Sequence, residues 1–158
     1  LEPRHLALEL TENILMERIE TALPMLATLR GLGVALSVDD FGTGYSSLAH
    51  LSSLPIDNLK IDRCFVRNLR PGTKESMVVR GIVQLRNSLG KRVVAEGIET
   101  AAQLEQLREM GCHSGQGFHF SKPLPAEQAQ ALLERALGSR GRSAVCANVQ
   151  TAGVALLH

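Results

Sequence analysis

The chain has 158 residues, of which 44% are hydrophobic, and its formal net charge is +1. This length and composition suit one globular domain with a hydrophobic core and exclude an intrinsically disordered protein. Because acidic and basic residues are interspersed, the sequence also excludes a surface that holds polymeric nucleic acid through its charge.

Cysteine usage and hydropathy indicate a reducing compartment. Cys64, Cys112 and Cys146 are odd in number and widely spaced, which argues against a disulfide framework and a thiolate zinc site. No run approaches the roughly 20 apolar residues needed to cross a bilayer, and the first residues do not resemble a secretion signal. We therefore expect a cytoplasmic protein with no membrane segment in this sequence.

Short strand-like runs alternate with longer helical patterns along the chain. The strand-like runs are residues 5–10, 34–38, 59–61, 92–95 and 117–120. Apolar stripes of helical spacing occupy residues 14–29, 77–89 and 104–110, and a last helix is predicted over 125–137. Repeated βα units with nearly continuous apolar strands predict an α/β fold with about five such units and a mainly parallel sheet.

Charged side chains gather where these predicted strands end. They are Glu9, Glu12, Asp39, Asp40, Lys60, Asp62, Glu96 and Glu99. Taken alone, each acidic residue could be a helix N-cap, and Lys60 could be a solvated or ion-paired lysine. In a (β/α) barrel, however, the C-terminal strand ends converge on one face, so the set together predicts a divalent-metal site with oxygen ligands. Two such ions about 4 Å apart would suit phosphoryl-ester hydrolysis.

Five motifs in register resemble successive signatures of the EAL-domain family. They are Glu9-Leu-Thr-Glu-Asn13, Asp39-Asp-Phe-Gly-Thr-Gly-Tyr-Ser-Ser-Leu48, Leu59-Lys-Ile-Asp-Arg63, Ala95-Glu-Gly-Ile-Glu-Thr100 and Gln116-Gly-Phe-His-Phe120. The resemblance identifies residues 1–137 as the C-terminal portion of an EAL domain, a partial TIM-type (β/α) barrel. Residues 138–158 are interpreted as a linker and an unassigned tail. A disordered extension, a docking peptide and an altered reading frame all remain open for that tail.

The resemblance implies hydrolysis of cyclic di-GMP to linear pGpG with Mg²⁺ or Mn²⁺. By position, Glu9, Asp39 and Asp40 match the family's metal ligands. Lys60 matches a lysine that contacts water or phosphate. Glu96 matches a residue that serves either the second metal or as general base, and Gln116 a polar group near the reactive water.

The resemblance also implies a mobile loop that links metal binding to dimerisation. Residues 40–47 match this loop, with Phe41, Gly42 and Gly44 among its members, and Glu12 matches the carboxylate that steadies it. Three further residues have supporting roles. Glu99 is a second-shell candidate or a first-turn helix acid, and Asp62 and Pro123 are candidate substrate contacts.

Two family features are missing from these 158 residues, namely the Glu-Ala-Leu signature and an asparagine on the following strand. Because a complete barrel uses eight strands and about 250 residues, we expect a missing upstream barrel segment or self-association, for example as a homodimer. Hydrolysis by this chain alone is expected to be impaired. The alternative is a non-catalytic EAL fragment that binds nucleotide or protein, and an enolase-like carbon-acid enzyme is a more distant third.

Overall fold

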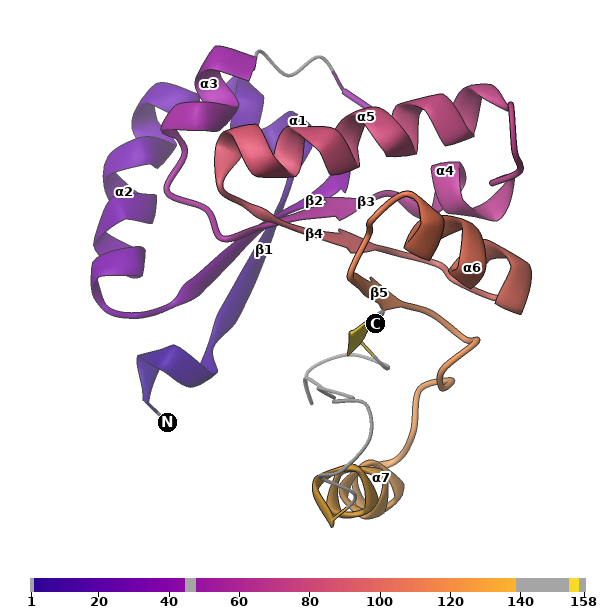
Figure 1. The fold of residues 1–158 in the computed structure, drawn as a ribbon. Helices are drawn as coiled ribbons and strands as arrows, with labels where there is room; N and C mark the ends of the chain where they lie inside the picture. Colours follow the sequence, from indigo (N-terminus) through magenta and orange to yellow (C-terminus); the bar gives the residue numbers. More distant parts are fainter. Residues whose placement is uncertain (1, 45–47, 139–153, 157–158) are drawn as a thin grey trace.

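Five parallel strands lie side by side in chain order, and a sixth, antiparallel strand extends their sheet (Figure 1). The computed structural model describes residues 2–44, 48–138 and 154–156. The strands are β1 (Ala7–Thr11), β2 (Ala35–Phe41), β3 (Asn58–Ile61), β4 (Arg92–Ala95), β5 (Ser114–Gln116) and β6 (Val154–Leu156). The helices are η1 (Pro3–His5), α1 (Glu12–Glu17), α2 (Ile19–Gly31), α3 (Leu48–Ser53), α4 (Arg63–Arg67), α5 (Lys74–Leu89), α6 (Ala101–Glu109) and α7 (Ala126–Gly138). This alternation confirms the predicted α/β fold with five βα units.

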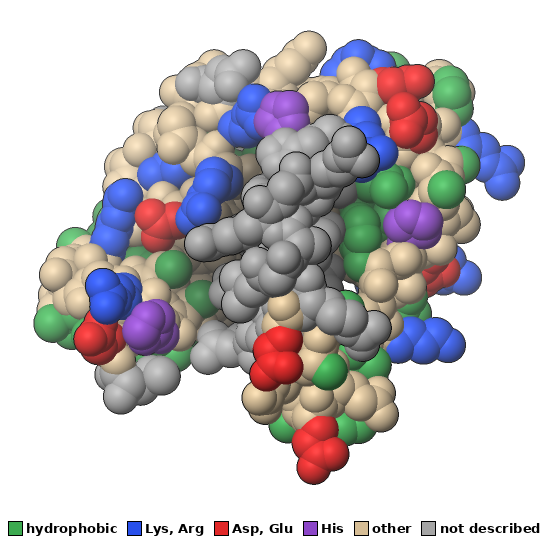
Figure 2. Space-filling model, turned by 60° about the horizontal axis from the view of Figure 1, so that its bottom comes forward, with side chains coloured by type: hydrophobic (Ala, Val, Ile, Leu, Met, Phe, Trp, Pro, Cys, Tyr) green, Lys and Arg blue, Asp and Glu red, His purple; other side chains and the backbone are tan. Residues whose placement is uncertain are grey.

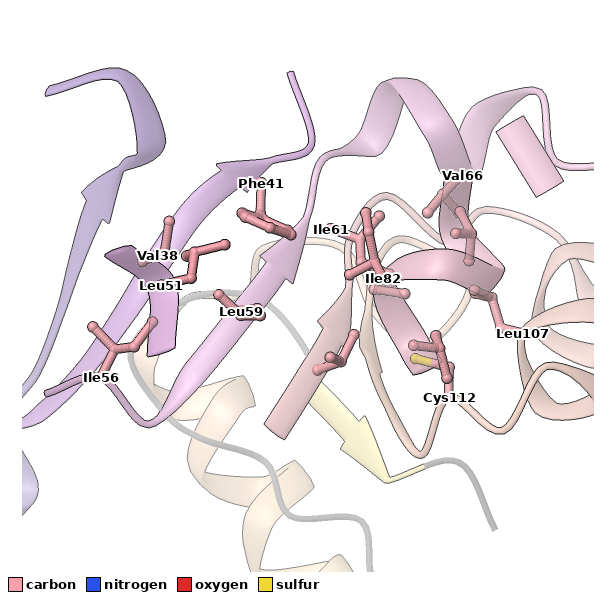
Figure 3. Close-up of a cluster of buried hydrophobic side chains, with 14 of the residues drawn as sticks. Val38, Phe41, Leu51, Ile56, Leu59, Ile61, Val66, Ile82, Leu107 and Cys112 are labelled. Atoms are coloured by element: carbon pink, nitrogen blue, oxygen red, sulfur yellow. The ribbon is translucent and has the colours of Figure 1, made fainter. Parts of the chain in front are cut away.

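Side chains of the central strands alternate between an apolar and a polar face of the sheet. On β2, Leu36 and Val38 are fully buried, and Leu59 and Ile61 are their counterparts on β3. Figure 3 shows this core, in which Leu51 of α3 and Ile82 of α5 pack with strand residues. The apolar face therefore lies under the helices, and the alternate positions of the same strands point to the other face.

Glycine residues end two of the predicted helices as expected. Gly90 takes a left-handed conformation, with φ of 62°, directly after α5. Gly111 follows α6 with φ of 80°. Because a residue without a Cβ adopts this conformation at little cost, these positions fix where the chain leaves each helix for the next strand.

The predicted fifth strand at residues 117–120 is wrong, because β5 lies just before it at Ser114–Gln116. Gly117 starts a turn that wraps around the backbone of Ile98. Ile98 N–H donates to the Gln116 carbonyl at 3.1 Å, and the Ile98 carbonyl accepts from His119 N–H at 2.9 Å. A Cβ on Gly117 would lie 2.2 Å from the Ile98 oxygen, so only glycine fits this turn.

The apolar stripe over residues 14–29 was expected to form one helix, but the structure divides it. The break falls at Arg18, between α1 and α2, where φ is −129° and ψ is 30°. Because of the break, α1 contacts both β1 and β2, whereas α2 runs back along β2. Pro24, expected early in the helix or at a kink, lies inside α2.

The prediction for residues 138–158 falls mostly outside the described residues. Within it, Val154–Leu156 form β6 and pair with β5, with Ala155 opposite Gly115. The domain boundary near residue 137 therefore stays a prediction. Among the described residues, no helix is both long enough and apolar enough for a bilayer crossing. Figure 2 shows acidic and basic side chains interspersed over one face, as their mixing along the sequence predicted.

Candidate active site at the ends of the parallel strands

Polar side chains from five neighbouring strands meet at the C-terminal ends of the sheet. Strands β1 and β2 are in register, with Glu9 opposite Ser37 and Thr11 opposite Asp39. On β3, Lys60 is opposite Val94 of β4, two residues before Glu96. Because the strands are parallel, their charged ends lie at the same edge, as the sequence predicted.

Lys60 lies at the centre of this edge. Its Nζ is 2.7 Å from Glu9 Oε2, 3.3 Å from Asp39 Oδ1 and 2.5 Å from Glu96 Oε1. The lysine side chain is only 7% exposed. Burial alone would lower the pKa of Lys60, but the hydrogen bonds that its ammonium donates to Glu9 and Glu96 outweigh burial, and the net pKa is raised. Lys60 is therefore a fixed positive charge among three carboxylates.

Glu96 connects Lys60 to the last parallel strand. Gln116 Nε2 donates to Glu96 Oε1 at 2.7 Å, so one carboxylate oxygen receives both the amide and the ammonium. Burial raises the pKa of Glu96 above its ordinary value, although the hydrogen bond and charge of Lys60 oppose the shift. A carboxylate with a raised pKa is better suited to accept a proton near neutral pH than an ordinary one.

Asp39 and Asp40 are neighbours in sequence but differ in their surroundings. Asp39 Oδ1 is buried and, apart from its ion pair with Lys60, makes no hydrogen bond within the described residues. Asp40 has a positive φ of 54° and hydrogen-bonds the carboxyl of Asp62. That bond and burial raise the pKa of Asp40, whereas Asp62 has a lowered pKa because hydrogen bonds from Cys64 and Asp40 outweigh its burial. Within this pair, Asp40 therefore holds a proton more readily than an isolated carboxyl does, and Asp62 less readily.

The donor atoms at this edge suit a hard divalent cation. They are carboxylate oxygens, with one buried oxygen of Asp39 left without a hydrogen bond and two acidic groups in contact at Asp40 and Asp62. A cation would satisfy that oxygen and relieve the repulsion between the carboxyls. In the described part of the chain, however, no three His, Cys, Asp or Glu side chains are gathered closely enough to hold an ion by themselves.

Glu12 supports the turn that follows β2. Its side chain is 1% exposed, and Oε2 accepts from Gly42 N–H at 2.9 Å and from Gly44 N–H at 3.1 Å. Gly42 has φ of 99°, and a Cβ on Gly44 would lie 2.6 Å from Asn13 Oδ1. The close approach of this turn to α1 therefore depends on Gly44, while the positive φ at position 42 favours glycine there. Residues 45–47 of the predicted loop lie outside the described residues.

Phe41, Glu99 and Pro123, also predicted as site residues, lie outside the Lys60 cluster, the Asp40–Asp62 pair and the Glu12 contacts. Phe41 was expected in the loop but is the last residue of β2, where its aromatic ring is buried in the core. The Glu99 side chain is exposed and has no hydrogen bond or ion pair with the rest of the described chain. Pro123 is exposed in the segment between β5 and α7.

One polar pair beneath the site was not predicted. Asn58 Nδ2 donates to Ser37 Oγ at 2.8 Å, and the two residues are opposite each other across β2 and β3. They precede Lys60 and Asp39 by two positions, so all four side chains share one face of the sheet. In a strand, residues two positions apart share a face, so the spacing from Asp39 and Lys60 could have predicted this pair from the sequence.

Cys64 lies beside this site, and we expect its thiol to be unreactive. Partial burial, together with the hydrogen bond and charge of Asp62, raises the pKa of Cys64 to about 11. At neutral pH, iodoacetamide should modify it at least about tenfold more slowly than an accessible thiol of ordinary pKa. Mass spectrometry of the Cys64 peptide should show the rate climbing up to about pH 11. Modification at the ordinary rate in neutral buffer would contradict this expectation, and the variant Asp62→Asn should react faster.

Comparisons of sequence place this arrangement in a known family. A family model described as EAL domain matches residues 1–123. The bifunctional diguanylate cyclase/cyclic di-GMP phosphodiesterase MucR of Pseudomonas aeruginosa is 48% identical over 131 residues, which are 83% of this chain and 19% of MucR. The cyclic di-GMP phosphodiesterase NbdA of the same organism is 47% identical over 128 residues, which are 81% of this chain and 16% of NbdA. The chain thus spans about a fifth or less of these relatives' length.

Solved structures agree with the sequence comparisons. The PaMucR phosphodiesterase in a c-di-GMP complex matches with a TM-score of 0.78, over 81% of this chain and 57% of that one. The Klebsiella pneumoniae protein BlrP1, in a manganese/cy-diGMP complex, matches at 34% identity with a TM-score of 0.71, over 77% of this chain and 31% of that one. The parallel sheet is accordingly part of a TIM-type barrel. Since the family model matches most of its length, the chain belongs to the EAL domain family.

Proposed function

We propose that this chain provides the C-terminal half of a site that hydrolyses cyclic di-GMP to linear pGpG with Mg²⁺ or Mn²⁺. The observation that carries the proposal is Lys60, buried among Glu9, Asp39 and Glu96 at the ends of four parallel strands. The family membership and the c-di-GMP complex of a 48% identical structure support the choice of substrate.

We assign metal binding to Glu9, Asp39 and Asp40. Asp39 Oδ1 is the best candidate ligand, because it is a buried oxygen with no hydrogen bond. Asp40 contacts Asp62, so a cation there would replace the hydrogen bond between the two carboxyls. A bound pair of divalent ions would supply charge neutralisation and an acidified water. The manganese/cy-diGMP complex of BlrP1 supports Mn²⁺ as one of the ions to be tested.

The remaining site residues would act on water and on phosphate. Lys60 keeps its proton at neutral pH, so its ammonium can orient a phosphate oxygen or a water molecule. Glu96 has a raised pKa and is suited to take the proton from the attacking water, although a ligand role is compatible with its position. Gln116 would hold Glu96 in place through its 2.7 Å hydrogen bond. Asp62 and Pro123 remain candidate substrate contacts, and Glu99 a supporting acid.

Hydrolysis by residues 1–158 alone should be impaired. The Glu-Ala-Leu glutamate and the asparagine that the family uses are not in this sequence, and metal affinity falls as ligands are lost. An upstream barrel segment or a second copy of the chain is therefore the partner that we expect to complete the site. The alternative is a non-catalytic EAL module, and the two missing ligands are the observation that favours it.

The test compares the 158-residue chain with the protein at its natural length. Each is incubated with cyclic di-GMP and Mg²⁺ or Mn²⁺, and pGpG is quantified by chromatography. We expect product only from the longer protein, and its loss when the ions are chelated. The absence of product from both would favour the non-catalytic module. In that case, binding of cyclic di-GMP measured by calorimetry would separate a nucleotide-binding module from a protein-binding one.

A further inference from the structure

Gln103 is a largely buried polar side chain away from the strand ends, on the first turn of α6. Its side chain makes three hydrogen bonds. Oε1 accepts from Glu99 N–H at 2.8 Å and from Thr100 N–H at 2.9 Å, and Nε2 donates to the Arg67 carbonyl at 3.3 Å. With the Thr100 hydroxyl, which accepts from Gln103 N–H, it forms a capping box at the start of α6.

The partners of Gln103 fix which end of its amide carries the oxygen. Two backbone N–H groups face one end of the amide, and a carbonyl faces the other. If the amide were reversed, its NH₂ group would face the two N–H donors and its oxygen would face the carbonyl oxygen. A capping box needs only the accepting end, and a glutamate would serve it equally well. The donated bond to Arg67 is therefore the additional feature that glutamine supplies here.

This donated bond joins two segments that carry the candidate site. Arg67 is the last residue of α4, and the first turn of that helix is capped by Asp62, which contacts Asp40. The turn from Glu96 to Thr100 meets α4 at its other end too, because a Cβ on Gly97 would lie 2.6 Å from Arg63 Cβ. The turn that follows β4 is thus attached to both ends of α4.

We propose that Gln103 is a positioning residue, which sets the place of Glu96 relative to Lys60 and Asp62 by holding the 96–100 turn against α4. The inference rests on the function proposed above. Glu96 contacts Lys60 at 2.5 Å and Gln116 at 2.7 Å, so a small displacement of the turn changes both contacts. Gln103 itself makes no hydrogen bond to Glu9, Asp39, Lys60 or Glu96; its partners are Glu99, Thr100 and Arg67.

The variant Gln103→Glu tests the proposal in the protein at its natural length. It keeps both accepted bonds but places a carboxylate oxygen against the Arg67 carbonyl. We expect the dissociation constant for Mn²⁺, measured by calorimetry, to rise about threefold to tenfold, toward the range seen when groups behind metal ligands are changed. Hydrogen exchange of the 96–100 turn should become faster, and the melting temperature should change little, because the α6 cap remains.

Two further variants separate positioning from loss of stability. Gln103→Met removes all three bonds and should weaken Mn²⁺ binding while also lowering the melting temperature. Thr73→Val removes the cap of α5, a bond of 3.2 Å to Ser76 N–H, and in the described part of the chain neither residue has a hydrogen bond or ion pair with the Lys60 cluster. It should lower the melting temperature and leave the Mn²⁺ dissociation constant within about twofold of the wild type.

Each outcome decides between the two proposals. If the wild type binds Mn²⁺ and Gln103→Glu binds it equally well, the positioning role is overturned and the proposed function stands. The positioning role also fails if Thr73→Val weakens Mn²⁺ binding as much as Gln103→Glu does. A wild type that binds no Mn²⁺ and yields no pGpG overturns the proposed function, and the positioning role with it.

Discussion

Replacing Lys60 with methionine should reduce cyclic di-GMP hydrolysis by the natural-length protein about 10²-fold to 10³-fold, the range typical of removing one preorganised hydrogen-bond donor from an active site. Methionine has a similar length but no charge, so Glu9, Asp39 and Glu96 would face one another without the ammonium that now lies 2.5 to 3.3 Å from each. Initial rates at saturating Mn²⁺ measure the effect. A rate within threefold of the wild type would contradict the assigned role.

The same substitution should also destabilise the protein without metal. Breaking a buried ion pair leaves an uncompensated charge, at a cost of about 3 kcal/mol in the free energy of unfolding. Added Mn²⁺ should return part of this stability, because a cation can neutralise the carboxylates that lose the ammonium. Since the pKa of Lys60 is raised, its contribution is complete below the ordinary lysine pKa and is lost only as the pH rises beyond it. Urea titrations at about pH 7 and about pH 9 should therefore show the same loss.

Lys91→Met is the matched control. Lys91 is the other partly buried lysine with defined partners, and its Nζ donates to the carbonyls of Leu54 at 3.0 Å and Ile56 at 2.9 Å. These partners precede β3, at the opposite ends of the strands from Lys60. The control should lower stability while leaving the rate at saturating substrate and the Mn²⁺ requirement near wild-type values. A similar loss of rate in both variants would assign the effect of Lys60→Met to general instability.

The fold could be predicted where hydrophobic periodicity was strong. Strand β4 has the predicted bounds, and the helix that ends at Gly90 was expected there, because burial and glycine chemistry act on the same residues that the pattern shows. Strand β5 was misplaced because its three residues, Ser114–Gln116, have no intrinsic preference for a strand. Its position depends on pairing with β4, which the sequence does not reveal.

The members of the site could be predicted better than their contacts. Because parallel strands end at the same edge of a sheet, the sequence predicted that Glu9, Asp39, Lys60 and Glu96 lie close together. The structure brings these four side chains into contact. Asp40 was expected beside them but turns to Asp62. The register of β2 and β3 shifts between Val38 and Phe41, and the positive φ of Asp40 falls within that irregularity. Such a bulge redirects a side chain without leaving a signature in the sequence.

Glu12→Ala is expected to have the second large effect, and it acts through the turn after β2. The carboxylate accepts two backbone hydrogen bonds, from Gly42 at 2.9 Å and Gly44 at 3.1 Å, while almost fully buried. Each bond to a charged acceptor contributes about 1.5 kcal/mol or more, so the free energy of unfolding should fall by about 2 to 3 kcal/mol. Urea denaturation of the natural-length protein measures this loss.

The substitution should also lower cyclic di-GMP hydrolysis about tenfold or more, because the turn directly follows the end of β2, which carries Asp39 and Asp40. Hydrogen exchange at Gly42 and Gly44 should become faster. This would show that the lower rate of hydrolysis comes from the turn and not from a change in α1. Glu17→Ala, an exposed change on the same helix, should leave exchange, stability and rate unchanged. If Gly42 and Gly44 stay protected in Glu12→Ala, other contacts hold the turn, and the carboxylate of Glu12 is not what keeps Asp39 and Asp40 in place.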